Sequence, residues 1–152
     1  MAETVSYPFT SRTYVSVAIA RGIAAANGHA DVTAAHLALG IIQEGANMAA
    51  AALQRSGVHL RHLRHLLESE LPPQGRPHFG EVLLPTTPGE RELIQRAADE
   101  VEKLKTPYLA DEHLLLAMLY DRTTPIAQFF AREGITYETI WEHLQVIRSG
   151  GI

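Results

Sequence analysis

Three histidines at helical spacing are the residues of this 152-residue sequence that most directly suggest metal chemistry. His59, His62 and His65 lie at i, i+3 and i+6, so neighbouring members would share one face of a helix, and imidazole is a common zinc ligand. Arg61 and Arg64 lie between them and would repel a cation. The alternative interpretation is a basic, solvated helix face. We therefore expect no metal and no other cofactor.

Two further histidines, His36 and His113, each precede an apolar run. We expect both to be structural histidines, hydrogen-bonded inside a half-buried helix. Nucleophilic catalysis needs a nucleophile beside a base, and no serine lies in a G-x-S-x-G turn. The phosphate-binding pattern G-x-x-x-x-G-K-[ST] is also absent. The sequence thus predicts a protein that is not an enzyme, with a metal- or small-molecule-binding helical protein as a distant alternative.

The elements that must position these residues are helices, marked by caps and breakers. The clearest start is Thr87-Pro88-Gly89-Glu90, a capping box with proline at the first helical position. Apolar residues follow it at helical spacing, and no segment shows a sustained two-residue alternation, so we expect an all-α fold. The eight expected helices cover residues 11–27, 34–44, 47–57, 60–71, 88–104, 112–120, 124–134 and 136–147.

The two halves of the sequence repeat the same order of caps and stops. His36-Leu37 aligns with His113-Leu114 at an offset of 77 residues, and Thr10 then aligns with Thr87. Sequence identity between the halves is low, but both halves share helix caps and the helical spacing of apolar residues, and these features constrain the fold. We predict two tandem four-helix repeats, residues 7–71 and 84–148, joined by a linker at residues 72–83 and packed as one compact domain. The proline- and glycine-rich stretch 72–80 should be its most protease-sensitive internal segment.

Motifs in both halves resemble a known family. Phe9-Thr10-x-Arg12, Gly28-His29, Ala35-His36-Leu37-x-Leu39-Gly40 and Glu112-His113-Leu114-Leu115-Leu116 are similar to those of the Clp N-terminal domain. The resemblance covers residues 7–148. It implies eight helices with pseudo-two-fold symmetry, in the mobile N-terminal module with which Clp-type AAA+ unfoldases dock substrates and adaptor proteins. Without a phosphate-binding loop, the chain would be either such a module or a free-standing accessory protein that binds the Clp assembly or sequesters its peptide ligands.

The same resemblance implies candidate ligand-binding residues. In some bacterial Clp modules the threonine and glutamate at the positions of Thr87 and Glu112 help bind phosphorylated arginine, so we expect a phosphoarginine-type site in the second repeat. The alternative is plain helix capping. In the first repeat Thr10 is present, but Ala35 replaces the glutamate, which would remove such a site. Thr10 and the aromatic Phe79 of the linker are candidates for partner docking.

Composition narrows the classes of partner. Hydrophobic residues make up 46% and charged residues 20%, which favours a packed core over disorder. The formal charge of -4 argues against nucleic acid and anionic membrane surfaces. No segment looks like a signal peptide or membrane span, and there is no cysteine, which is consistent with the cytoplasm. We expect a monomeric chaperone- and proteolysis-related domain whose partners are protein substrates, adaptors or Clp ATPase and peptidase subunits.

Overall fold

Helices alone build the part of the chain that the computed structural model describes, residues 7–77 and 87–150. This confirms the expected all-α fold of eight helices, and the one strand-like feature within these residues is an isolated parallel bridge between Phe9 and Leu109. The helices are α1 (Ser11–Ala26), α2 (Ala34–Glu44), α3 (Met48–Arg55), α4 (Leu60–Glu68), α5 (Pro88–Leu104), α6 (Asp111–Tyr120), α7 (Pro125–Arg132) and α8 (Tyr137–Arg148).

Side-chain caps fix where these helices begin. The side chains of four capping residues accept the backbone N–H three residues further on, which satisfies one of the free donors of a first turn; they are Thr10, Asn47, Thr124 and Thr136. Helix α4 ends at Glu68, earlier than expected, because a residue that precedes a proline, as Leu71 does, disfavours helical geometry. Helix α6 begins at Asp111, one residue earlier than expected.

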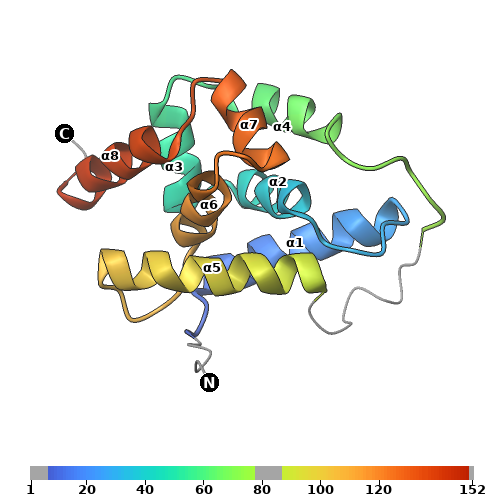
Figure 1. Cartoon of the computed structure of the whole chain (residues 1–152), viewed down its shortest axis with the longest axis horizontal. Helices are drawn as coiled ribbons and strands as arrows, with labels where there is room; N and C mark the ends of the chain where they lie inside the picture. The colour runs from blue at the N-terminus through green and yellow to red at the C-terminus, as the bar shows by residue number, and fades with distance from the viewer. Residues whose placement is uncertain (1–6, 78–86, 151–152) are drawn as a thin grey trace.

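Figure 1 shows α1 and α5 along one side of the molecule, a middle layer of α2 and α6 with α3 and α8 beside it toward one end, and α4 and α7 on the opposite side. The middle layer carries the core. Every residue of α6 from Asp111 to Leu119 is buried, as expected for a helix that is apolar nearly all round. Both repeats contribute to one continuous hydrophobic cluster, because its members include Leu37 and Leu53 as well as Leu114 and Phe130.

The closest approach between helices is the crossing of α1 and α2. A Cβ atom added to Gly40 on α2 would lie 2.1 Å from the backbone oxygen of Ser16 on α1. Glycine at this position therefore lets the two backbones touch directly.

The first part of the predicted linker packs on the domain. The Gly75 N–H donates to the Asn27 carbonyl at 2.7 Å, and a Cβ on Gly28 would lie 2.3 Å from the Gly75 backbone. Residues 72–77 are thus fixed at the end of α1. The remainder of the predicted linker, residues 78–83, lies outside the described residues.

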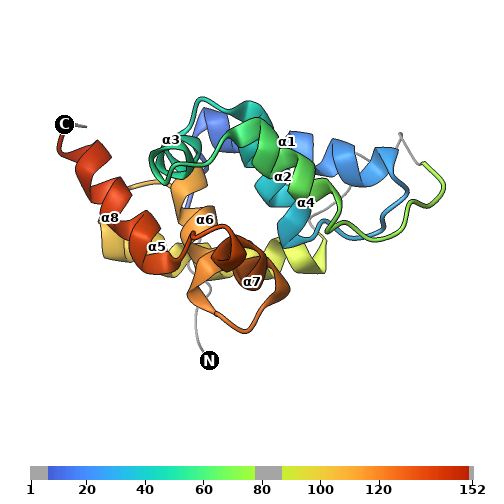
Figure 2. The same ribbon diagram turned by 90° about the horizontal axis from the view of Figure 1, so that it is seen from above.

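The two repeats are not packed alike. Helix α3 packs against both α6 and α8, whereas its counterpart α7 has substantial helix contacts with α6 alone among the described elements. Figure 2 shows α3 near α8 toward one end of the molecule, and both views place α7 beside α4. This difference leaves the second repeat's third helix less enclosed than the first repeat's.

Candidate functional site

Each repeat begins its first helix against the second helix of the other repeat. The Thr10 N–H donates to the Leu109 carbonyl at 3.1 Å, and the Leu109 N–H donates to the Pro8 carbonyl at 2.8 Å. These bonds hold the start of α1 beside the start of α6. We call this place the α1–α6 junction, formed by Thr10, Thr13, Ser16, Asp111 and Glu112.

The pseudo-symmetric contact joins the start of α5 to the start of α2. The Val32 N–H donates to the Thr87 hydroxyl at 3.1 Å, and the Gly89 N–H donates to the Asp31 carboxylate at 3.2 Å. Thr87 also forms a capping box with Glu90. We call this place the α2–α5 junction, formed by Asp31, Val32, Thr33, Ala35, Thr87 and Gly89.

Glu90 has a second role that its place in a capping box does not reveal. Its side chain is fully buried, and it accepts the Arg21 guanidinium at 2.9 Å. It also accepts the Thr87 N–H at 3.3 Å. A buried carboxylate costs free energy unless it is paired and hydrogen-bonded, and here one residue satisfies the cap and ties α5 to α1.

The α1–α6 junction holds two buried carboxyl groups. Asp111 is 1% exposed, and within the described residues neither of its oxygens makes a well-formed hydrogen bond. Burial raises the pKa of Asp111 to about 7, although the nearby Ser16 hydroxyl partly opposes this. Burial also raises the pKa of Glu112, which is opposed by its own backbone N–H and by the charge of Arg148. This junction is therefore a buried acidic site beside a helix start.

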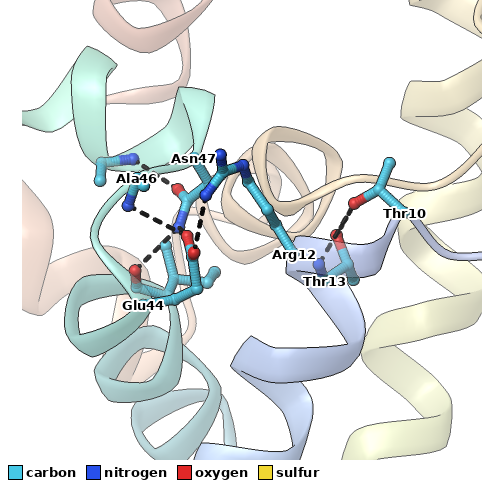
Figure 3. Close-up of polar contacts among 8 residues, drawn as sticks. Thr10, Arg12, Thr13, Glu44, Ala46 and Asn47 are labelled. Atoms are coloured by element: carbon cyan, nitrogen blue, oxygen red, sulfur yellow. Dashed lines mark hydrogen bonds and ion pairs between the residues drawn. The ribbon is translucent and has the colours of Figure 1, made fainter.

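A polar network on the outer side of this junction fixes the turn between α2 and α3 (Figure 3). The Arg12 guanidinium donates to Glu44 at 3.1 Å, while the other Glu44 oxygen accepts from Ala46 N–H and Asn47 Nδ2. Burial opposes ionisation of Glu44, but these hydrogen bonds hold its pKa below the usual value. In the same view the Thr10 hydroxyl bonds to Thr13, so it is already used as a cap.

The structure does not bring Thr87 and Glu112 together. Thr87 lies at the start of α5, a 17-residue helix and so roughly 25 Å long. Glu112 lies near the other end of α5. The positive charge of Arg148 lowers the pKa of Glu112, and the Arg148 guanidinium donates at 3.1 Å to the carbonyl of Leu104, the last residue of α5. Glu112 instead shares its junction with Thr10. The fourth candidate, Phe79, lies outside the described residues.

His36 and His113 are bonded as structural histidines. The Thr33 N–H donates to His36 Nδ1 at 2.9 Å, and His36 Nε2 lies 2.8 Å from His29 Nδ1. Because His29 Nε2 must donate to the Pro72 carbonyl at 3.0 Å, His36 is the donor between the two rings. His113 likewise accepts the Ala110 N–H at 2.8 Å. Burial lowers the pKa of both His36 and His113 to about 4.

The histidines of α4 are arranged differently. His62 and His65 are exposed and His59 caps the helix, while Leu63 and Leu67 point into the core. In residues 7–77 and 87–150, no group of three or more histidine, aspartate or glutamate side chains is arranged as a metal site. None of the helices in these segments is both long enough and apolar enough to span a bilayer.

The fold and its two junctions define a helical double-repeat domain in which each repeat completes the other. The sequence matches the model of the Clp repeat (R) N-terminal domain over residues 8–133, and the chain belongs to this family. Clp N-terminal domains are non-catalytic modules that dock substrates and adaptors for Clp unfoldases.

Two curated relatives illustrate the match. The chain is 29% identical over 128 residues to the negative regulator of genetic competence ClpC/MecB of Bacillus subtilis, an alignment that covers 84% of this chain and 15% of that protein. It is 30% identical over 142 residues to the chaperone protein ClpB of Bacillus cereus, covering 91% of this chain and 16% of the relative. The chain thus corresponds to about one-sixth of the length of these relatives.

Solved structures show the same fold. The N-terminal domain of Hsp104 from Candida albicans matches with a TM-score of 0.72 at 18% identity, covering 95% of this chain and 93% of that one. The N-domain of ClpV from Vibrio cholerae matches with a TM-score of 0.74 at 18% identity, covering 98% and 95% of the two chains.

Proposed function

We propose that this chain is a protein-binding domain that docks substrates or adaptor proteins for a Clp-type unfoldase. The family match over residues 8–133 carries the proposal. The absence of a phosphate-binding loop from the 152 residues supports a role in recognising protein partners rather than in their ATP-driven unfolding. The formal charge of -4 favours protein partners over nucleic acid.

Direct binding of an unfolded client tests this function. The immobilised chain is expected to bind a reduced, carboxymethylated model protein, which cannot fold, and to bind its native form at least tenfold more weakly. Surface plasmon resonance measures both affinities, with a purified Clp ATPase ring as a third analyte. Binding to the ring alone would favour the free-standing accessory role, and binding to none of the three would contradict both roles.

We also propose that any recognition of phosphorylated arginine belongs to the α1–α6 junction rather than to a Thr87–Glu112 pair. Glu112 supplies a carboxylate there for the guanidinium, and the start of α1 at Thr10 is the helix start of the other repeat that this junction offers to a phosphate. The α2–α5 junction has the equivalent threonine, Thr87, but Ala35 offers no carboxylate.

Titration with a phosphoarginine peptide separates these possibilities. One site per chain is expected, and Glu112→Gln should weaken it by roughly ten- to a hundredfold, because a charge-assisted hydrogen bond contributes about 1.5–3 kcal/mol. The matched control Thr87→Ser keeps the cap and should bind normally. Ala35→Glu should add a second site beside Thr87. Normal binding by Glu112→Gln would assign these residues to folding and capping alone.

A further inference from the structure

Because α7 packs mainly against α6, an open groove remains beside it. Helix α3 is covered by α8, but α7 and α4 are bridged near their ends by the exposed ion pair of Arg132 with Glu70, at 3.0 Å. The space between α7, the start of α2 and the start of α5 is a groove of about 420 Å³. This volume lies in the range of sites that bind small ligands or a few side chains. We call it the α7 groove.

The floor of the α7 groove is apolar and comes from three helices. Leu93 of α5, Met118 of α6 and Phe129 of α7 line it, and each is less than 10% exposed. Methionine is flexible and polarisable, so such a floor adapts to differently shaped apolar side chains. Ala35 forms part of the wall. The floor therefore suits an inserted aliphatic or aromatic side chain.

Two positions that line the α7 groove hold different types of residue at the equivalent places in the other half of the domain. At the 77-residue offset, Leu93 corresponds to the buried Ser16, and Ala35 corresponds to Glu112. The small Ala35 side chain is thus a wall of an apolar groove on one side, while a carboxylate occupies its counterpart on the other. The replacement that removes a charged site from the α2–α5 junction also makes this groove apolar.

The rim of the α7 groove is acidic. Its described lining residues include three carboxylates, Asp31, Glu70 and Glu92, and one cation, Arg96, which is paired with Glu92 at 3.1 Å. With Arg132, which lies outside the lining and pairs with Glu70, three negative and two positive charges leave the rim net negative. Helices α2, α5 and α7 all begin at the groove, which alone would favour an anion. However, Asp31 already accepts the Gly89 N–H of α5, and the Thr124 hydroxyl caps α7. The rim is therefore complementary to a cation.

We propose that the α7 groove binds a peptide segment in which an apolar side chain is flanked by arginine or lysine. The apolar side chain contacts Leu93, Met118 and Phe129, and the basic side chain lies against the acidic rim. This inference deepens the proposed docking function and rests on it. It assigns a chemical class to the clients or adaptors that the domain recognises, and it places their contact away from the α1–α6 junction.

Three labelled peptides test the proposal by fluorescence anisotropy. They share a glycine- and serine-rich frame of ten residues and carry Arg-Leu-Arg, Glu-Leu-Glu or Arg-Ser-Arg at the centre. The Arg-Leu-Arg peptide is expected to bind at least tenfold more tightly than either of the others. Its affinity should fall as salt rises from low to high concentration, because exposed charges are screened. Equal binding of Glu-Leu-Glu would overturn the proposal.

Two variants locate the binding in the groove. Ala35→Trp fills the groove and should weaken Arg-Leu-Arg binding at least tenfold, whereas Ala131→Trp, on an exposed part of α7 outside the groove, should not. Glu92→Lys reverses an exposed rim charge and breaks its pair with Arg96, and it should weaken binding three- to tenfold, with Glu142→Lys on α8 as its control. Circular dichroism verifies that each variant is folded.

The outcomes separate this inference from the proposed function. If Ala35→Trp and Glu92→Lys both bind the Arg-Leu-Arg peptide like the wild type, the groove is not the site and the inference fails. If the peptide does not bind but the unfolded client does, the inference fails and the docking function stands. If neither binds, both fail.

Discussion

A Gly40→Ala variant is expected to be several kcal/mol less stable than the wild type, or not to fold. The added methyl carbon would lie 2.1 Å from the Ser16 backbone oxygen and 3.2 Å from the Ala20 nitrogen. Both atoms belong to the backbone of α1, so no side-chain rotation relieves the overlap, and α1 and α2 must separate. Their contact is the most extensive between any two described helices. Overpacking of a core typically costs about 1–3 kcal/mol and sometimes more.

The matched control for this variant is Gly22→Ala. Gly22 also lies inside a helix, but a Cβ at this position would meet nothing within 4 Å. Alanine is a better helix former than glycine by about 0.8–1.0 kcal/mol, so this variant should be slightly more stable than the wild type. Urea unfolding followed by circular dichroism measures both changes. If Gly40→Ala were also stabilising, the close crossing of α1 and α2 would be wrong.

The helices could be predicted from the sequence because their signals are local. The capping box at Thr87 and Glu90 depends on residues within one turn, and the structure confirms it. The repeat was also visible, since matching caps and apolar periods survive at low identity.

The pairing of the repeats could not be predicted in this way. An apolar helix face looks the same whether it packs on its own repeat or on the other one. Placing Thr87 and Glu112 in one site assumed that each repeat is complete by itself. The hydrogen bonds from Thr10 to Leu109 and from Val32 to Thr87 connect the repeats crosswise instead. Only three-dimensional packing contains this information.

The burial of polar side chains likewise could not be predicted from the sequence. An aspartate in the first turn of a helix is usually exposed and complements the helix dipole, so Asp111 carries no sign in the sequence of being 1% exposed. Ala35 illustrates the converse. In the sequence it is a missing carboxylate, and in the structure it is a wall of the α7 groove. Both properties depend on which helices converge at a point.

The free energy of unfolding is expected to rise from pH 4 to about pH 7 and to change little above it. Below this pH, His36 and His113 bind protons more readily in the unfolded chain, because burial lowers their folded pKa to about 4. Their stabilising contribution is therefore lost as the pH falls from 6.5 to 4. Asp111 acts in the opposite sense: its folded pKa of about 7 exceeds the unfolded value of 3.8, so its stabilising contribution is lost as the pH rises from about 4 to 7 and changes little above 7. Two histidines outweigh one aspartate between pH 4 and 6.5, and all three contributions level off above pH 7.

An Asp111→Asn variant should be more stable than the wild type at pH 8, and by a larger margin there than at pH 6. Each pKa unit corresponds to about 1.4 kcal/mol, so a shift from 3.8 to about 7 predicts a gain of about 2–4 kcal/mol once relaxation of the site is allowed for. The amide carries no charge to bury, and it can donate to the Ser16 hydroxyl, which has no partner among the described residues. Asp121→Asn, at the other end of the same helix, is the control and should leave the difference in stability between pH 6 and pH 8 unchanged. Urea titrations at pH 6 and pH 8 measure the difference. If Asp111→Asn followed the wild type at both pH values, Asp111 would not be a buried charge in the folded protein.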